Sequence, residues 1–264
     1  ALRPALSDRQ GGALFISTPK GHNWFWRLWR RGQEDGTEWQ SWRFPTSSNP
    51  YIAPAEIEAA RQDLPERIFR QEYIAEFIDD AGGVFRGVAQ AAALSETPRV
   101  DGHQYIMGVD WGKANDFTVL KVMDVATRSE VYSDRFNQID YAVQRQRLGV
   151  VADRYRPTVI LAESNSIGEP IIEQLQREGL PVRGFTTTNA TKAVIIEALA
   201  LAFEQGSIHI INDPVTVGEL QAYEVERTPS GMVKYSAPEG MHDDTVMALA
   251  LAWQACARPS GADL

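Results

Sequence analysis

The pattern of apolar and polar positions predicts alternating strands and helices over the second two thirds of the chain. The first three predicted strands follow one another through short turns, whereas the later strands alternate with helices. This order indicates an α/β fold whose mixed sheet begins as an antiparallel meander, continues with parallel strands and is flanked by helices. The predicted strands are 104–110, 117–124, 130–136, 157–163, 181–185 and 207–211, the helices are 140–155, 168–178, 190–205 and 243–257, and a hairpin spans 223–236.

The N-terminal part has a different organisation. The apolar run "GGALFISTPKG" (11–21) predicts a strand that enters a turn, and "HNWFWRLWRRG" predicts a helix that stops at Gly32. A second helical stretch within 53–79 is interrupted at Pro65, which predicts two helices. The Gly82-Gly83 pair is then the best domain boundary, giving an N-terminal segment, 1–82, and a larger domain, 83–264.

The aromatic and basic residues of the first predicted helix have two interpretations. Phe25, Leu28 and Trp29 recur at helical spacing, which favours packing against the preceding strand with a basic outer face over stacking on DNA. If this helix is normally covered by a further part of a larger protein, Trp24, Trp26 and Trp29 would be exposed and self-association would follow.

Composition narrows the class of protein. A chain of 264 residues with 44% hydrophobic and 23% charged residues is ordinary for a globular protein. We expect a soluble protein of the cytoplasm, because no apolar run is long enough to span a membrane and the start shows no signal-peptide pattern. The single cysteine, Cys256, excludes an internal disulfide and a cysteine-rich zinc site. The net charge of -9 argues against DNA binding through a global basic surface, though not through a local patch or bound metal.

Acidic residues stand at the ends of three predicted elements. Asp110 ends the strand 104–110, Glu163 ends the apolar strand 157–163, and Asp243 and Asp244 begin the last helix. Taken singly, each strand acid is more often a turn residue, and one acid of the pair is expected to cap its helix. If the three elements converge, cations must offset the repulsion, and an all-oxygen set of ligands favours Mg²⁺ or Mn²⁺. Two such ions roughly 3.5–4 Å apart would suit phosphodiester hydrolysis.

The ordered set of these segments resembles a known family. "GVDWG", "ESNSIG" and "HDDTVMALALA" are similar to the three acidic motifs in the nuclease domain of the large terminase subunit of tailed bacteriophages, which has a ribonuclease H-like fold. "ISTPKG" resembles the coupling motif at the end of the terminase ATPase core, and "SSNPYIAPAEI" and "RQEYIAEFID" resemble the segment leading into the nuclease. Each motif alone is weak, and the specificity lies in their order.

The resemblance implies a metal-dependent endonuclease that cuts concatemeric double-stranded viral DNA during packaging, in the host cytoplasm. It implies that the metal ligands are Asp110, Glu163 and Asp244, with Asp243 either a fourth ligand or the helix cap. The expected partners are DNA, the portal protein, the small terminase subunit and the rest of the ATPase domain. Asp116 is either a turn residue or an assistant to the metal, and Lys192 either contacts a phosphate or is a solvated helix lysine.

The sequence also limits these expectations. It contains no G-x-x-x-x-G-K-[ST] phosphate loop, so residues 1–82 are expected to be a remnant of the ATPase domain and the chain to lack ATPase activity. An actin-like or hexokinase-like ATPase is disfavoured because those folds duplicate this domain. A junction-resolving nuclease and a non-catalytic module that docks on the portal remain alternatives.

Overall fold

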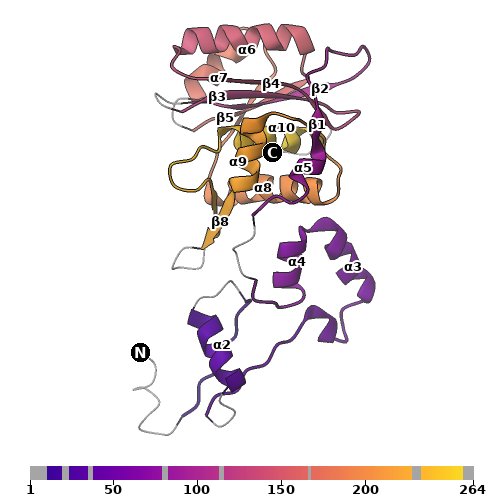
Figure 1. The fold of residues 1–264 in the computed structure, drawn as a ribbon, viewed down its shortest axis with the longest axis vertical. Coiled ribbons are helices and arrows are strands. Elements are labelled where there is room, and N and C mark those ends of the chain that lie inside the picture. Colours follow the sequence, from indigo (N-terminus) through magenta and orange to yellow (C-terminus); the bar gives the residue numbers. More distant parts are fainter. Residues whose placement is uncertain are drawn as a thin grey trace. The chain divides into compact units, whose positions relative to one another are not determined.

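The computed structural model describes residues 11–19, 24–34, 38–78, 83–112, 116–165, 168–227 and 233–257. The chain divides into two compact units, one within residues 1–79 and one formed by Asp80–Leu264 together with Asp63–Pro65. Figure 1 shows both units as ribbons. No helix among the described residues is both long enough and apolar enough to cross a membrane.

A five-stranded mixed sheet forms the centre of the larger unit. Its strand order is β4-β3-β2-β5-β6, in which β2 pairs antiparallel with β3 and parallel with β5. The predicted meander followed by parallel strands is therefore confirmed. The strands are β2 (Tyr105–Asp110), β3 (Thr118–Asp124), β4 (Ser129–Phe136), β5 (Val159–Glu163) and β6 (Val182–Phe185).

Helices cover both faces of this sheet (Figure 1). On one face α6 (Tyr141–Tyr155) and α7 (Gly168–Arg177) pack against a core that includes Met107 and Val109 of β2. On the other face lie α8 (Asn189–Glu204) and α10 (Asp244–Ala257), and Ile106 of β2 joins their core. Successive residues of a strand point to opposite faces, so a strand covered on both sides is apolar throughout.

Gly108 brings the last helix unusually close to the sheet. A Cβ at this position would lie 2.1 Å from the Ala248 carbonyl oxygen and 2.4 Å from the Ala252 amide nitrogen, both on α10. Only a residue without a side chain permits this approach. Gly108, the first glycine of "GVDWG", thus sets the distance between α10 and β2 where they cross. This crossing lies two residues before Asp110.

Four elements of the larger unit were not predicted or differ from the prediction. The short helix α5 (Val88–Ala91) and strand β1 (Ala92–Leu94) follow the predicted domain boundary, where no element was predicted, and α9 (Pro214–Ala222) precedes the hairpin. The strand expected at 207–211 is only β7 (Ile210–Ile211), which pairs with β1 in a separate two-stranded sheet. The predicted hairpin is confirmed as β8 (Glu224–Arg227) and β9 (Val233–Ser236). The residues between these two strands, 228–232, lie outside the described residues.

The smaller unit corrects two predictions. Residues 11–19 form no strand, and among the described strands none pairs with them, so this apolar run lacks the hydrogen-bonding partner that a strand requires. The helix α2 (Trp24–Glu34) continues through Gly32, whose missing side chain lets Ser41 donate a hydrogen bond to the Trp29 carbonyl at 2.5 Å. The interruption at Pro65 is confirmed by α3 (Pro54–Asp63) and α4 (Glu66–Glu72).

The aromatic face of α2 is only partly buried. Phe25 and Trp29 both contact the Phe77 ring, but no residue of α2 is fully buried, and Trp24 remains 57% exposed.

Candidate metal centre

The two strand acids lie side by side at one edge of the sheet. Asp110 is the last residue of β2 and Glu163 the last of β5, and these strands are parallel neighbours, with Val109 opposite Ala162. The carboxyl ends of parallel strands meet at the same edge, where ligands bind in α/β folds. The two strand acids are therefore adjacent, which convergence on one site would require.

Asp110 is buried and is surrounded by the carboxyl groups of other acidic residues. The pKa of its carboxyl is raised well above the ordinary value, first by burial, then by the charge of Glu163 and a hydrogen bond with it, and then by the charges of Asp244 and Asp243. Burial and like charges both disfavour an ionised carboxyl. The acids of the other two elements thus lie within electrostatic reach of Asp110.

Asp244 begins α10 and faces the turn after β2. The Phe117 backbone amide donates to its Oδ2 at 3.3 Å, and His242 Nδ1 lies 3.6 Å from the same oxygen. Burial is the main cause that raises the pKa of Asp244 to about 6. His242 also lies 3.8 Å from Asp116, so Asp116 belongs to the rim of the site. His242 was missed from sequence, although it directly precedes the two acids.

Asp243 is held by residues of two other elements. Lys192 Nζ of α8 donates to its Oδ2 at 2.8 Å, and the Tyr223 hydroxyl donates to the same oxygen at 3.3 Å. Lys192 is consequently not a solvated surface lysine, since its side chain is only 19% exposed. Burial, and after it the charge of Asp243, raises the pKa of Tyr223. Tyr223 was not predicted, because nothing in its sequence context distinguishes it from a core aromatic residue.

The start of α10 is capped from a different helix. Glu219 of α9 accepts hydrogen bonds from the Thr245 amide at 2.9 Å and from the Thr245 hydroxyl at 2.6 Å. Asp243 occupies the N-cap position, since its carbonyl accepts from the Met247 amide, but its carboxylate points to Lys192 and Tyr223 instead. We expected the side chain of Asp243 or Asp244 to cap its own helix. The capping side chain is instead Glu219, which belongs to the neighbouring helix α9.

The donor atoms at this edge suit a hard divalent cation. Four carboxylates, those of Asp110, Glu163, Asp243 and Asp244, supply only oxygen, and the crowding that raises the pKa of Asp110 would be relieved by bound positive charge. In the part of the chain that the structure describes, no three acidic, His or Cys side chains stand in a preformed ligand arrangement. Lys192 instead provides the positive partner of Asp243, and the His242 ring lies beside Asp244.

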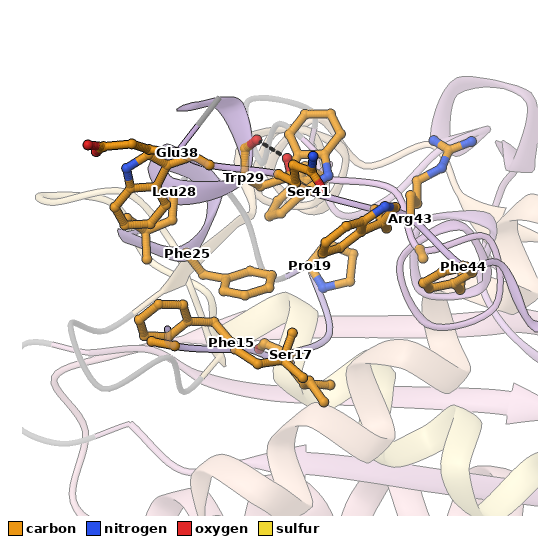
Figure 2. A pocket seen from close by; sticks show the side chains of 18 residues that line it. Phe15, Ser17, Pro19, Phe25, Leu28, Trp29, Glu38, Ser41, Arg43 and Phe44 are labelled. Atoms are coloured by element: carbon orange, nitrogen blue, oxygen red, sulfur yellow. Dashed lines mark hydrogen bonds between the residues drawn. The ribbon is translucent and has the colours of Figure 1, made fainter. Parts of the chain in front are cut away.

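An apolar hollow lies in the smaller unit. Figure 2 shows Phe15, Phe25 and Phe44 among the side chains that line it. Glu38 and Arg43 are the charged members of this lining. With so few ionisable groups it offers no counterpart to the carboxylates of the larger unit.

The strand order and the placement of the acids define a class of protein. A mixed sheet of this order, with acids on its two central parallel strands and on a closing helix, is the ribonuclease H-like arrangement. Residues 107–255 match the family described as Terminase RNaseH-like domain, and the chain belongs to this family.

Relatives in phages support this assignment. The large terminase subunit of Thermus virus P23-45 is 33% identical over 282 residues, which cover 96% of this chain and 57% of that protein. The large terminase nuclease of phage G20c with bound magnesium has a TM-score of 0.62 and 28% identity, covering 66% of this chain and 98% of that one. The nuclease domain of Thermus phage P74-26 has the same TM-score and 27% identity, covering 69% and 100%. The chain therefore spans little more than half the length of the curated relative and matches nearly all of each nuclease domain.

Proposed function

We propose that this chain is a metal-dependent endonuclease that cuts concatemeric double-stranded viral DNA during genome packaging. The observation that carries this proposal is that Asp110 and Glu163 end neighbouring parallel strands at one edge of the sheet, where the charges of Asp244 and Asp243 act on the buried Asp110. It is supported by the similar G20c nuclease, which has been solved with magnesium, cobalt and zinc.

The residues that would hold the ions are Asp110, Glu163, Asp244 and Asp243. Two Mg²⁺ or Mn²⁺ ions would supply an activated water and stabilise the leaving oxygen of the phosphodiester. Asp110, the most buried of the acids, fixes the inner side of the site. Lys192, which donates to Asp243 in this structure, would be released if cations neutralised that carboxylate and would then bind a DNA phosphate.

The wider biological setting is also a proposal. Residues 1–82 would be the end of the packaging ATPase domain, supported by the similarity to a large terminase subunit over 96% of the chain. The nuclease would act in the host cytoplasm, with the portal protein and the small terminase subunit positioning the DNA. Cleavage would then depend little on base sequence.

The direct test is nicking and linearisation of plasmid DNA by the purified chain. We expect activity in Mn²⁺ or Mg²⁺ and none in EDTA. The proposed ligands are all carboxylates, so the positive charge needed for catalysis would come from the bound cations, which EDTA removes. Cleavage that persists in EDTA would contradict the metal mechanism, and a folded chain inactive in every metal would favour a non-catalytic module. Cleavage confined to four-way junctions would favour a junction-resolving nuclease.

A second prediction concerns the two adjacent acids. Asp243→Asn and Asp244→Asn should each lower cleavage, and neither should cost the ~1 kcal/mol of stability typical of a lost N-cap, because Glu219 supplies the capping oxygen. Thermal melting and plasmid cleavage measure the two effects. An Asp243→Asn variant that is fully active but less stable by this amount would restore Asp243 as the cap.

A further inference from the structure

Glu219 is a buried acid that the proposed mechanism does not use. It is 6% exposed and lies on α9, the helix that the sequence pattern did not reveal. Its two oxygens have different partners: Oε2 accepts from Thr245, and Oε1 lies 3.7 Å from Arg135 of β4.

The first amides of a helix need acceptors, and the N-cap side chain usually provides one. At the start of α10 this would be the Asp243 carboxylate. Because Glu219 accepts from the Thr245 amide, Asp243 is free to face Lys192 and Tyr223. The interhelical cap thus makes a second carboxylate available without leaving the helix end unsatisfied.

Glu219 also joins a chain of contacts that returns to Asp244. The guanidinium of Arg135 lies over the Phe117 ring, and the Phe117 amide donates to Asp244 Oδ2. Glu219 therefore hydrogen-bonds Thr245, the residue that follows Asp244 in the chain. Through Arg135 it also reaches Phe117, whose amide donates to Asp244.

The helix that carries Glu219 is itself anchored to the sheet. Thr216 lies three residues earlier, on the same side of α9, and accepts a hydrogen bond from the buried Lys121 of β3 at 2.7 Å. Lys121 also pairs with the buried Glu130 of β4 at 2.7 Å. The pair with Glu130 keeps the buried Lys121 in place, because breaking a buried ion pair is costly, and the hydrogen bond from Lys121 to Thr216 connects α9 to β3.

We infer that Glu219 is a positioning residue for the metal centre: by capping α10 from α9, it orients Asp244 and keeps Asp243 available to bind a cation. This inference rests on the proposed function. Removing Glu219 would let the Asp243 carboxylate turn back to cap its own helix, and metal binding would weaken. The affinity of the chain for DNA should stay the same.

The experiment compares Glu219→Ala, Glu219→Gln and Asp140→Ala with the parent chain. Asp140 caps α6 by accepting from the Val143 amide, on the opposite face of the sheet, so Asp140→Ala is a matched loss of a helix cap away from the site. Two quantities are measured: the Mn²⁺ concentration for half-maximal plasmid cleavage, and the rise in melting temperature on adding Mn²⁺.

For Glu219→Ala we expect the half-maximal Mn²⁺ concentration to rise about tenfold or more, the scale for removing a group that orients a metal ligand, with the KM for DNA within about twofold of the parent. The Mn²⁺-dependent rise in melting temperature should shrink in parallel. Glu219→Gln retains an acceptor oxygen and should stay within about twofold of the parent in both measurements. Asp140→Ala should melt lower but respond to Mn²⁺ as the parent does.

A Glu219→Ala variant that melts lower yet keeps the parental response to Mn²⁺ would show an ordinary structural cap and overturn the inference. Loss of the Mn²⁺ response in Glu219→Gln would also overturn it, because the charge and not the hydrogen bond would then matter. If Glu219→Ala does not fold, Thr245→Val is used instead, because it removes only the hydroxyl donor to Glu219. This variant should also weaken the response to Mn²⁺, but by a smaller amount than Glu219→Ala would. An unchanged response would overturn the inference. A parent chain that neither cleaves DNA nor is stabilised by Mn²⁺ would instead remove the proposed function, and this inference with it.

Discussion

Asp110→Asn should abolish DNA cleavage while leaving the metal-free protein at least as stable as the parent. Asparagine keeps the shape of the side chain and removes one negative charge from a buried site where Glu163, Asp244 and Asp243 all act against it. In EDTA the variant should melt no lower than the parent. In Mn²⁺ at about 100 times its Kd the parent should gain about 2.7 kcal/mol and roughly 5–10 °C in melting temperature, and the variant much less, so the order of stability inverts.

The pH dependence of this comparison has a definite sign. Because the pKa of Asp110 is higher in the folded chain than in the unfolded chain, the folded state binds more protons, and stability falls as pH rises from the ordinary carboxyl value through the raised one. Asparagine does not titrate. The advantage of Asp110→Asn without metal should therefore be larger at pH 8 than at pH 5, measured by thermal melting.

The control for Asp110→Asn is the same substitution at an exposed acid. Asp101 is paired with Arg99 at the surface, and its side chain is 97% exposed. Asp101→Asn should change neither cleavage nor the response to Mn²⁺, whereas cleavage by Asp110→Asn should fall by more than about 100-fold, the scale for removing one group that stabilises reacting charge. If Asp110→Asn still cleaves DNA and is mildly destabilised with or without metal, Asp110 is a turn acid and the three acidic elements do not form one site.

The sequence was sufficient for the sheet and for the placement of the strand acids, because each depends on a local pattern. A strand covered on both faces consists of consecutive apolar residues. The end of each apolar run therefore showed that Asp110 and Glu163 are the last residues of their strands. Once the strands are taken as parallel neighbours, the topology places the two acids together. Residues 11–19 show the limit of the same reasoning, since an apolar run forms a strand only if another strand pairs with it.

The partners of the α10 acids depend on tertiary contacts that no local pattern reveals. Lys192, Glu219 and Tyr223 approach α10 from separate segments, and α9 has little periodic contrast between its faces. The aspartate pair "DD" predicted a cap at the start of the last helix, but local preference cannot show that a glutamate 26 residues away supplies it. The pairing of Lys192 with Asp243 was equally invisible.

Gly108→Ala should be among the most damaging single changes in the larger unit, although it adds only a methyl group. The new Cβ would meet backbone atoms of α10 at Ala248 and Ala252, at separations that non-bonded carbon atoms do not adopt, so the helix must move. Overpacking of this kind costs about 1–3 kcal/mol, and the melting temperature should fall by roughly 2–12 °C. Since α10 begins at Asp244, its displacement also moves a proposed ligand, and a shift of about 1 Å is enough to reduce a rate about 100-fold.

Gly149→Ala is the matched control for this prediction. Gly149 lies inside α6, where an added Cβ would meet nothing within 4 Å, so alanine should stabilise the helix by roughly 0.5–1 kcal/mol and leave cleavage unchanged. Cleavage is measured at a temperature at which melting curves show every variant to be folded, so that lost activity reports geometry and not unfolding. A Gly108→Ala variant with parental stability and cleavage would show that α10 has room to shift without disturbing Asp244. The close crossing of β2 and α10 would then not be what positions the third acidic element beside Asp110.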